Sequence, residues 1–373
     1  MVPWPAWLPQ PPTLDELLTD LMDLLATPAP PFGEAPRAAK LSQRLDGLGL
    51  HPYQDSVGNV IVRWGNPGPG AYAFLAHLDT ALEVGRVAPR REGGRLYCHG
   101  SADDGSGLAV LTAIAARALK SAAKPRHPVY FVANVGEEGL GDLRGARAFV
   151  AEHCEELAGV VALDGRLGDI VHEGIASRRL EAVLRTPGGH SWSDYGSPSS
   201  VHLMGRIIER LDGLRLPKAP RTTLNVGVMQ GGTAVNAIAA EASCLIDLRS
   251  EDSAELSRLE QRVRDTFAAE VQPPARCDIR AIGDRPGGKL ARSHPLVMAA
   301  ADALAAVGEH VSFATGSTDA NAALGAGVAG ICCGVGRGAL AHTPDEWLEE
   351  SSLVPGLQFC AELLTRLASP LPS

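Results

Sequence analysis

The stretch AYAFLAHLD, residues 71–79, decides the fold class because it joins a short apolar run to a histidine and an aspartate. The run has the length of one buried strand. Side chains alternate along a strand, so His77 and Asp79 lie on the same face at its end. An open α/β sheet presents its reactive side chains at the carboxyl ends of its strands. We therefore expect His77 and Asp79 to belong to a functional site.

The same arrangement returns further along the chain. Val129–Val135 and Gly159–Leu163 are predicted strands, and Gly105–Leu119, rich in alanine and leucine, is a predicted helix. Acidic residues stand at the ends of these elements: Asp103, Asp104, Glu137, Glu138 and Asp164. Far downstream, the apolar run Gly327–Val335 leads to His342. Strands that alternate with helices predict an α/β fold with a mostly parallel sheet flanked by helices.

The pattern changes between about residues 176 and 285. The predicted elements follow there in the order β-α-β-β-α-β, the ferredoxin-like α+β arrangement: Arg178–Thr186, Pro198–Leu211, Thr222–Met229, Ala239–Leu248, Ser253–Glu270 and Arg276–Ile282. This segment contains none of the acidic and histidine clusters described above. We expect a catalytic domain in two parts, residues 1–175 and 286–373, with an inserted domain at 176–285.

Composition narrows the class of protein. The chain has 373 residues and a formal net charge of -9, which argues against nucleic acid as a partner because nucleic-acid-binding proteins present a basic surface. Its seven cysteines are odd in number and form no C-x-x-C pair, so a disulfide framework is not expected. The N-terminus lacks the segments of a signal peptide, and no apolar run reaches the roughly 18 residues of a membrane span. We expect a cytoplasmic protein that binds neither nucleic acid nor membrane.

Two histidines and several carboxylates, with no cysteine among them, suit a pair of zinc-like ions that share one carboxylate and one water. Taken alone, each short motif has an ordinary explanation, such as a turn or a solvated helix start. Their order over most of the chain resembles the dinuclear zinc exopeptidase and deacylase family of peptidase T, glutamate carboxypeptidase, acetylornithine deacetylase and succinyl-diaminopimelate desuccinylase. Further family landmarks are Gly188-Gly189-His190, Gly231-Gly232-Thr233, Asp247-Leu248-Arg249 and His342-Thr343.

The resemblance implies a complete ligand set for two divalent metal ions, most simply zinc, with cobalt and manganese as alternatives. The implied metal ligands are His77 and Asp164 on one ion, Glu138 and His342 on the other, and Asp103 as the bridge between them. In this family the peptide bond after the bridging residue is usually cis, so a cis Asp103–Asp104 bond is expected. Asp79 would accept the second N–H of the His77 ring and fix its tautomer.

The resemblance also assigns roles outside the ligand set. Glu137 would act as general base and acid, taking a proton from the shared water and passing it to the leaving amine. His190 would stabilise the oxyanion in the active site of a partner subunit, which implies a homodimer formed through an inserted lid or dimerisation domain. Arg249, Asn236 and Thr318 would contact the substrate. An ion pair at Arg249 and turns at Asn236 and Thr318 remain the structural alternatives.

The implied activity is that of a metal-dependent exopeptidase acting on small peptides, because Leu163-Asp164-Gly165 and Gly174-Ile175-Ala176 resemble peptidase T. An N-acyl-amino-acid deacylase is the alternative, since it breaks an amide bond with the same ions. A non-catalytic binding protein on a decayed enzyme fold is the third interpretation. Two departures from the family pattern, Gly105 in place of lysine and Ala239 in place of proline, concern loop shape and substrate preference.

Overall fold

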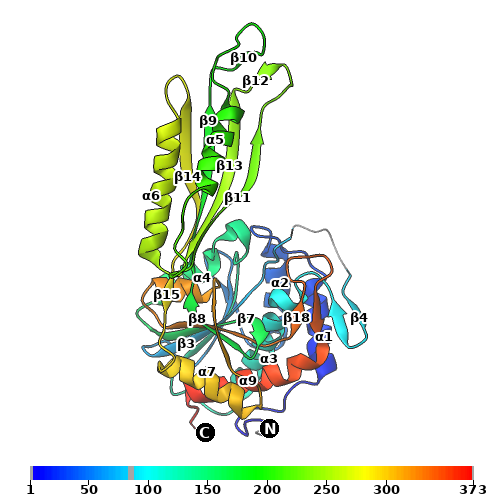
Figure 1. Ribbon diagram of the computed structural model, residues 1–373. Helices are drawn as coiled ribbons and strands as arrows, with labels where there is room; N and C mark the ends of the chain where they lie inside the picture. The colour runs from blue at the N-terminus through cyan, green and yellow to red at the C-terminus, as the bar shows by residue number, and fades with distance from the viewer. Residues whose placement is uncertain (1–2, 83–87, 372–373) are drawn as a thin grey trace. The chain divides into compact units, whose positions relative to one another are not determined.

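The computed structural model describes residues 3–82 and 88–371, and Figure 1 shows their course. The chain divides into two compact units. One contains the residues up to Gly174 together with those from Lys289 onward, and the other is Ile175–Gly288. We call them the large unit and the small unit and describe each by itself.

The large unit is built on one sheet with the strand order β1-β2-β6-β3-β7-β17-β8-β15, and β16 also pairs with β8. The strands are β1 (Tyr53–Gln54), β2 (Val60–Trp64), β3 (Ala71–His77), β6 (Val129–Asn134), β7 (Leu157–Leu167), β8 (Asp169–Gly174), β15 (Gly288–Lys289), β16 (Ser312–Gly316) and β17 (Gly330–Gly334). The central neighbours β6, β3, β7 and β17 are parallel, whereas β2 and β8 join them antiparallel. The prediction of a mostly parallel sheet is confirmed.

Helices cover both faces of this sheet. Strand β3 shows how, because Phe74 and Ala76 pack into one apolar cluster and Ala73 and Leu75 into another. The first cluster receives α1 (Leu14–Leu25), α2 (Ala35–Gly47), α3 (Ser106–Lys120), α7 (Pro295–Ala306) and α9 (Leu353–Ala368). The second receives α4 (Arg144–His153) and α8 (Ala320–Gly325). A strand buried on both sides must be apolar throughout, as residues 71–76 are.

A second, smaller sheet in the large unit was not anticipated from the sequence. It has the order β18-β19-β5-β4, formed by β18 (Gly338–Ala339), β19 (Trp347–Glu349), β5 (Arg95–Tyr97) and β4 (Arg90–Glu92). Its strands are three residues long or shorter, so they carry little periodic signal. The pairing of β19 with β5 joins the segment that precedes Asp103 to the segment that follows His342.

The small unit is an antiparallel sheet of order β11-β13-β9-β14 with two helices packed against it. In chain order its main elements are β9 (Ala176–Arg185), α5 (Ser200–Asp212), β11 (Thr222–Gly231), β13 (Glu241–Ser250), α6 (Ser253–Glu270) and β14 (Arg276–Arg285). The predicted β-α-β-β-α-β order is therefore confirmed. The short strands β10 (Gly189–His190) and β12 (Ala237–Ile238) pair separately.

Short helical turns complete the large unit: η1 (Ser101–Gly105), η2 (Gly139–Gly141) and η3 (Glu350–Ser352). One predicted boundary is wrong, because strand β7 continues to Leu167 and Asp164 lies inside it. Pairing of β17 with β7 as far as Leu167 extends the strand beyond the apolar residues that predicted it. No helix among the described residues is long and apolar enough to cross a membrane.

Candidate metal centre

The side chain of Asp103 lies between two imidazole rings. Its Oδ1 is 3.0 Å from Nε2 of His77, and its Oδ2 is 3.0 Å from Nε2 of His342. Asp103 comes from η1, His77 from the end of β3 and His342 from the loop after β18. His342 has φ of 63°, a left-handed conformation that histidine adopts more readily than most residues. Three separate segments thus converge on one carboxylate.

Two groups of possible metal ligands share this carboxylate. Asp103 forms one group with His77 and Asp164 and a second with Glu138 and His342, and within each group the ligand atoms lie within 4.8 Å of one another. Nε2 of His342 is 3.0 Å from Oε1 of Glu138. These are the two sets that the sequence predicted for a bridged pair of ions.

Glu137 belongs to a third group, with His77 and Glu138, that meets the same distance limit. Its side chain is 6% exposed, as is that of Glu138. Both glutamates come shortly after β6, whose last residue, Asn134, pairs with His77 at the end of the parallel strand β3. Glu137 therefore lies against the predicted ligand set without being needed to complete either of the two groups that Asp103 joins.

Asp79 holds the two glutamates through their backbone. Its Oδ1 accepts the N–H of Glu137 at 3.0 Å and its Oδ2 accepts the N–H of Glu138 at 2.8 Å. The predicted contact with His77 is made mainly by the backbone, since Nδ1 of His77 lies 3.0 Å from the Asp79 carbonyl oxygen and 3.6 Å from its Oδ1. The strand end places Nδ1 over the carbonyl and turns the carboxylate toward the next strand.

The peptide bond between Asp103 and Asp104 is cis, as expected. The two adjacent carboxylates point to different surroundings. Asp104 is 1% exposed and accepts the backbone N–H groups of His77 and Gly107, each at 3.0 Å. It therefore joins the end of β3 to the start of α3, while Asp103 faces the two imidazoles.

The electrostatics of the cluster follow from burial and mutual contact. Burial alone would raise the pKa of Asp103, but its hydrogen bonds to His342 and His77 hold the pKa below the usual value. The same bond raises the pKa of His342 to about 9. Burial, and then the charge of Asp103, raise the pKa of Glu138 to about 8 and that of Asp164 to about 7. Several acidic groups in one buried site oppose one another's ionisation.

The residues present fit a pair of divalent cations. Oε1 of Glu138 is buried and lacks a hydrogen-bond partner, although it lies 3.0 Å from an imidazole nitrogen that also faces Asp103. One N–H cannot point at both oxygens. Ligands about 2.0–2.1 Å from a tetrahedral zinc ion would lie about 3.3 Å from each other, which is close to the spacing seen. Imidazole and carboxylate donors without thiolate also suit cobalt and manganese.

Two buried acidic residues were missed as site residues. Glu346, four positions after His342, accepts the backbone N–H of Asp103 at 2.9 Å. Asp319 accepts a bond of 2.7 Å from Nδ2 of Asn134, and burial, followed by the charge of Glu137, raises its pKa to about 8. Asp319 directly follows Thr318, the residue of this loop that is predicted to contact the substrate. The sequence held one signal for both residues, because each is acidic and lies within four positions of a predicted site residue, Glu346 after His342 and Asp319 after Thr318.

Thr318 has a local role in the structure. Its backbone N–H donates to Oδ1 of Asn321 at 3.0 Å, and its Oγ1 accepts the N–H of Ala320 at 3.3 Å. Both bonds stabilise the turn into α8, which is the structural alternative that the sequence left open.

The other predicted site residues, the oxyanion-stabilising His190 and the substrate contacts Asn236 and Arg249, lie in the small unit and are exposed. The Nδ1 atom of His190 accepts the N–H of Trp192 at 3.2 Å. Nε of Arg249 donates to Oδ2 of Asp247 at 2.8 Å, so the ion pair considered from the sequence is present. The backbone oxygen of Asn236 accepts the N–H of Ser191 at 3.0 Å.

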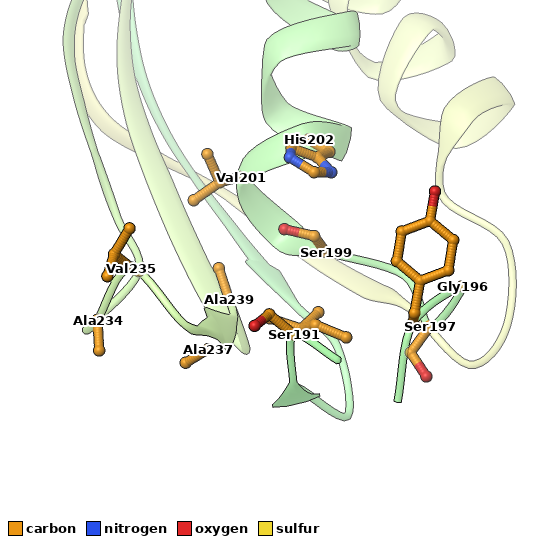
Figure 2. A pocket seen from close by; sticks show the side chains of 13 residues that line it. Ser191, Gly196, Ser197, Ser199, Val201, His202, Ala234, Val235, Ala237 and Ala239 are labelled. Atoms are coloured by element: carbon orange, nitrogen blue, oxygen red, sulfur yellow. The ribbon is translucent and has the colours of Figure 1, made fainter. Parts of the chain in front are cut away.

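A hollow of about 580 Å³ opens in the small unit beside the segments that carry His190 and Asn236, and Arg249 does not line it. Figure 2 shows side chains around it, among them Ser191, Val201, His202, Val235 and Ala239. Nearby, Trp192 and Tyr195 are 86% and 90% exposed.

Comparison with known proteins places this arrangement among related folds. Residues 73–366 match the sequence model of Peptidase family M20/M25/M40. An acetylornithine deacetylase of Myxococcus xanthus is 26% identical, covering 92% of this chain and 94% of the relative. A succinyl-diaminopimelate desuccinylase of Corynebacterium glutamicum is 27% identical over 77% of this chain and 79% of the relative. The uncharacterised protein YqjE of Bacillus subtilis is 24% identical over 94% and 98%, respectively.

Solved structures share the fold at lower identity. A tripeptidase from Staphylococcus aureus gives a TM-score of 0.80 at 21% identity, covering 96% of this chain and 99% of that one. A dinuclear metal-binding peptidase of the M20 family from Bacillus subtilis gives 0.69 at 18% identity, with 96% and 99% covered. These likenesses establish the fold over 96% of the chain.

Proposed function

The chain belongs to peptidase family M20/M25/M40 and is a metallohydrolase, and on this premise we propose that it is an exopeptidase that hydrolyses small peptides. The observation that carries the proposal is the position of Asp103, 3.0 Å from each of two imidazole rings and common to two ligand groups. We propose that His77, Asp103 and Asp164 hold one divalent ion and that Asp103, Glu138 and His342 hold the other. Zinc suits these donors best.

The proposed mechanism gives each side chain a separate task. Two divalent ions bound here would polarise the scissile carbonyl and lower the pKa of the attacking water. A carboxylate oxygen of Glu137 takes the proton of that water and delivers it to the nitrogen of the leaving amine. Asp79 fixes the backbone of Glu137 by accepting its N–H, so the base cannot drift from the cluster.

Residues of the small unit would complete the site. Because Nδ1 of His190 accepts a backbone N–H, the neutral ring carries its proton on Nε2, which can donate to an oxyanion. A substrate carboxylate would bind Arg249 through Nη1 and Nη2, the edge of the guanidinium away from Nε and its bond to Asp247. Asn236 offers an amide from the loop between β11 and β12.

An activity screen tests the proposal. The purified chain, supplied with zinc, cobalt or manganese, is offered di- and tripeptides beside N-acetyl and N-succinyl amino acids. Hydrolysis of free peptides supports the exopeptidase, which we favour because Leu163-Asp164-Gly165 and Gly174-Ile175-Ala176 resemble peptidase T. Preference for the acylated compounds supports the deacylase, the activity for which two of the relatives are named. Hydrolysis of neither class, with metal bound, favours the binding protein.

We also propose that the small unit forms a homodimer. Strand β11 lies at the edge of its sheet and carries Val228 and Met229, which are 43% and 44% exposed. An exposed apolar edge strand invites pairing with another strand. Val228→Lys should turn a dimer into a monomer in light scattering, whereas Val354→Lys, at a 50% exposed valine of α9, should not. A monomeric, fully active unmodified chain would remove both the dimer and the action of His190 on a partner subunit.

A further inference from the structure

We infer that Glu346 is a positioning residue for the metal centre, fixing the backbone that carries Asp103. This inference rests on the proposed metal-dependent function. The carboxylate of Glu346 is completely buried, at 0% exposure. It does not belong to any of the ligand groups formed by the described residues. Its task must therefore be found in what it contacts.

The carboxylate accepts three backbone N–H groups of a single turn. Oε1 accepts from Ala102 at 2.8 Å and from Asp103 at 2.9 Å, and Oε2 accepts from Gly100 at 2.7 Å. The backbone oxygen of Glu346 also accepts the N–H of Cys98 at 3.1 Å. The turn that ends in the bridging residue is thus bound to one side chain at both ends.

The turn is shaped for this contact. Gly100 has φ of 77°, and a Cβ atom there would lie 2.3 Å from Cγ2 of Thr80. A residue with a side chain would be strained and would collide, so the chain can approach Glu346 in this way only with glycine. Asp103 has φ of -120° and ψ of 92°, and Asp104 is also outside the helical range, which begins at Gly105. Hydrogen bonds from outside the turn must hold this irregular backbone.

Glu346 also connects the turn to another segment of the site. Glu346 lies four residues after His342, so its hydrogen bonds to the turn of Asp103 connect that turn to the loop that carries His342. Nδ1 of His99 lies 3.4 Å from Oε2, and Nε2 of His99 accepts the N–H of Leu82, which follows the strand of His77. The carboxylate therefore hydrogen-bonds the turn of Asp103 to the segment that carries His342, and it lies beside the His99 ring without a hydrogen bond to it among the described residues.

The chemistry explains why a carboxylate is needed. Three N–H donors converge on two oxygens, and a carboxylate accepts at both without offering a proton of its own. In Glu346→Gln, one oxygen becomes an NH₂ group that faces a backbone N–H. A buried donor left unsatisfied costs free energy, and the turn would move to relieve it. Because Asp103 belongs to both ligand groups, such movement would weaken both ions.

The test measures metal binding directly in the full chain. Metal-free protein, prepared with a chelator, is titrated with zinc by calorimetry and then loaded with cobalt to record the spin-coupled signal of two bridged ions. Glu346→Gln should weaken zinc affinity about 10- to 100-fold, as other partners of metal ligands do, and reduce the coupled signal. Glu346→Asp retains the charge on a shorter side chain and should recover part of the affinity.

Glu350→Gln is the matched control. Glu350 is also buried, at 8% exposure, but it pairs with Arg91, whose Nε and Nη2 each lie 2.9 Å from its oxygens. This variant should leave zinc affinity and the cobalt signal unchanged. If Glu346→Gln and Glu346→Asp fold and bind two ions as the unmodified chain does, the inference is wrong while the proposed function stands. An unmodified chain that binds no ion would overturn the proposed function, and this inference with it.

Discussion

The candidate residues of the two units differ in how they are held. In the large unit, His77, Glu137 and Glu138 are 1%, 6% and 6% exposed, and their backbone or ring atoms are bound by Asp79 or Asp104. His342 is the exception there, because its side chain is 56% exposed and is held through its contacts with Asp103 and Glu138. In the small unit, the side chain of Arg249 is 44% exposed and His190 stands on the surface. Charges arranged in advance and away from water suit bond cleavage. Exposed groups suit recognition, because their surroundings are completed only by the molecule that covers them.

The largest effect should come from the glutamate pair of the large unit. Glu137→Gln removes a proton carrier and no predicted ligand, so turnover should fall about 10²- to 10⁴-fold with metal content preserved. Glu138→Gln removes a proposed metal ligand and should lower metal content as well as turnover. Steady-state kinetics and elemental analysis of the same samples separate the two results.

The glutamate pair also tests the comparison between the units. Both side chains are equally buried and adjacent in sequence, so each variant is the other's control for folding. Loss of metal in Glu137→Gln, with metal retained in Glu138→Gln, would exchange their roles. If the two variants lose turnover and metal to the same extent, Glu137 and Glu138 do not have the separate roles of general base and metal ligand.

Much of the candidate metal centre could be predicted from the sequence because its residues lie at or near the ends of buried strands. The runs 71–76 and 129–133, which precede His77 and the glutamate pair, are apolar, and a strand buried on both faces leaves that signal in the sequence. The helix Ser253–Glu270 was predicted to the residue, since Asp252 caps it and Val271 leaves the helical conformation. Local chemistry determines such boundaries.

Contacts between distant segments could not be predicted in this way. The pairing of β19 with β5 depends on strands of three residues. The side chain of Glu346 reaches a turn more than 240 positions away, and nothing in either segment indicates the other. The alternation of one strand predicts that Asp79 contacts His77, and Oδ1 of Asp79 does lie 3.6 Å from Nδ1 of that ring. Its hydrogen bonds to the backbone of Glu137 and Glu138, after the neighbouring strand, could not be predicted. Register and loop geometry decide these contacts, and a single sequence does not contain them.

A smaller effect is expected from Arg249 in the small unit, and it should depend on the substrate. Two parallel charge-assisted bonds to a carboxylate contribute about 1.5–3 kcal/mol, or roughly 10- to 150-fold in kcat/KM, and lysine cannot reproduce them. Arg249→Lys should therefore be impaired on a free tripeptide and much less on the same peptide with an amidated C-terminus. Kinetics with the two peptides measure the difference.

Arg185→Lys is the control for this experiment. Arg185 is also an exposed arginine of the small unit, bound through Nε to Oε2 of Glu241 at 3.0 Å. The Arg185→Lys variant should hydrolyse both peptides as the unmodified chain does. Equal losses on the two peptides in Arg249→Lys would mean that the bond of Arg249 to Asp247 supports the unit and that recognition of the carboxylate lies elsewhere.

The smallest expected effect is a change of melting temperature with pH, caused by the titrating groups of the metal cluster in the large unit. In the metal-free protein, the pKa of Glu138 is about 8 instead of 4.5, that of Asp164 about 7 instead of 3.8, and that of His342 about 9 instead of 6.5. Each group binds its proton more tightly in the folded chain. The folded state therefore holds more protons than the unfolded state between about pH 5 and 9, and stability must fall as pH rises through this range.

Melting of the chelator-treated protein from pH 5 to 9 should show this fall, on the order of 5 °C. Asp103 and Asp79 have lowered pKa values, so their opposite contribution is lost only in more acidic solution, outside this range. Zinc binds the deprotonated ligands, so saturating zinc should abolish or reverse the slope. Glu138→Gln, which cannot titrate, should flatten the metal-free slope. A metal-free protein that becomes more stable toward pH 9 would contradict the raised pKa values of the buried carboxylates. The contrast drawn between the buried groups of the large unit and the exposed groups of the small unit would then lose its electrostatic basis.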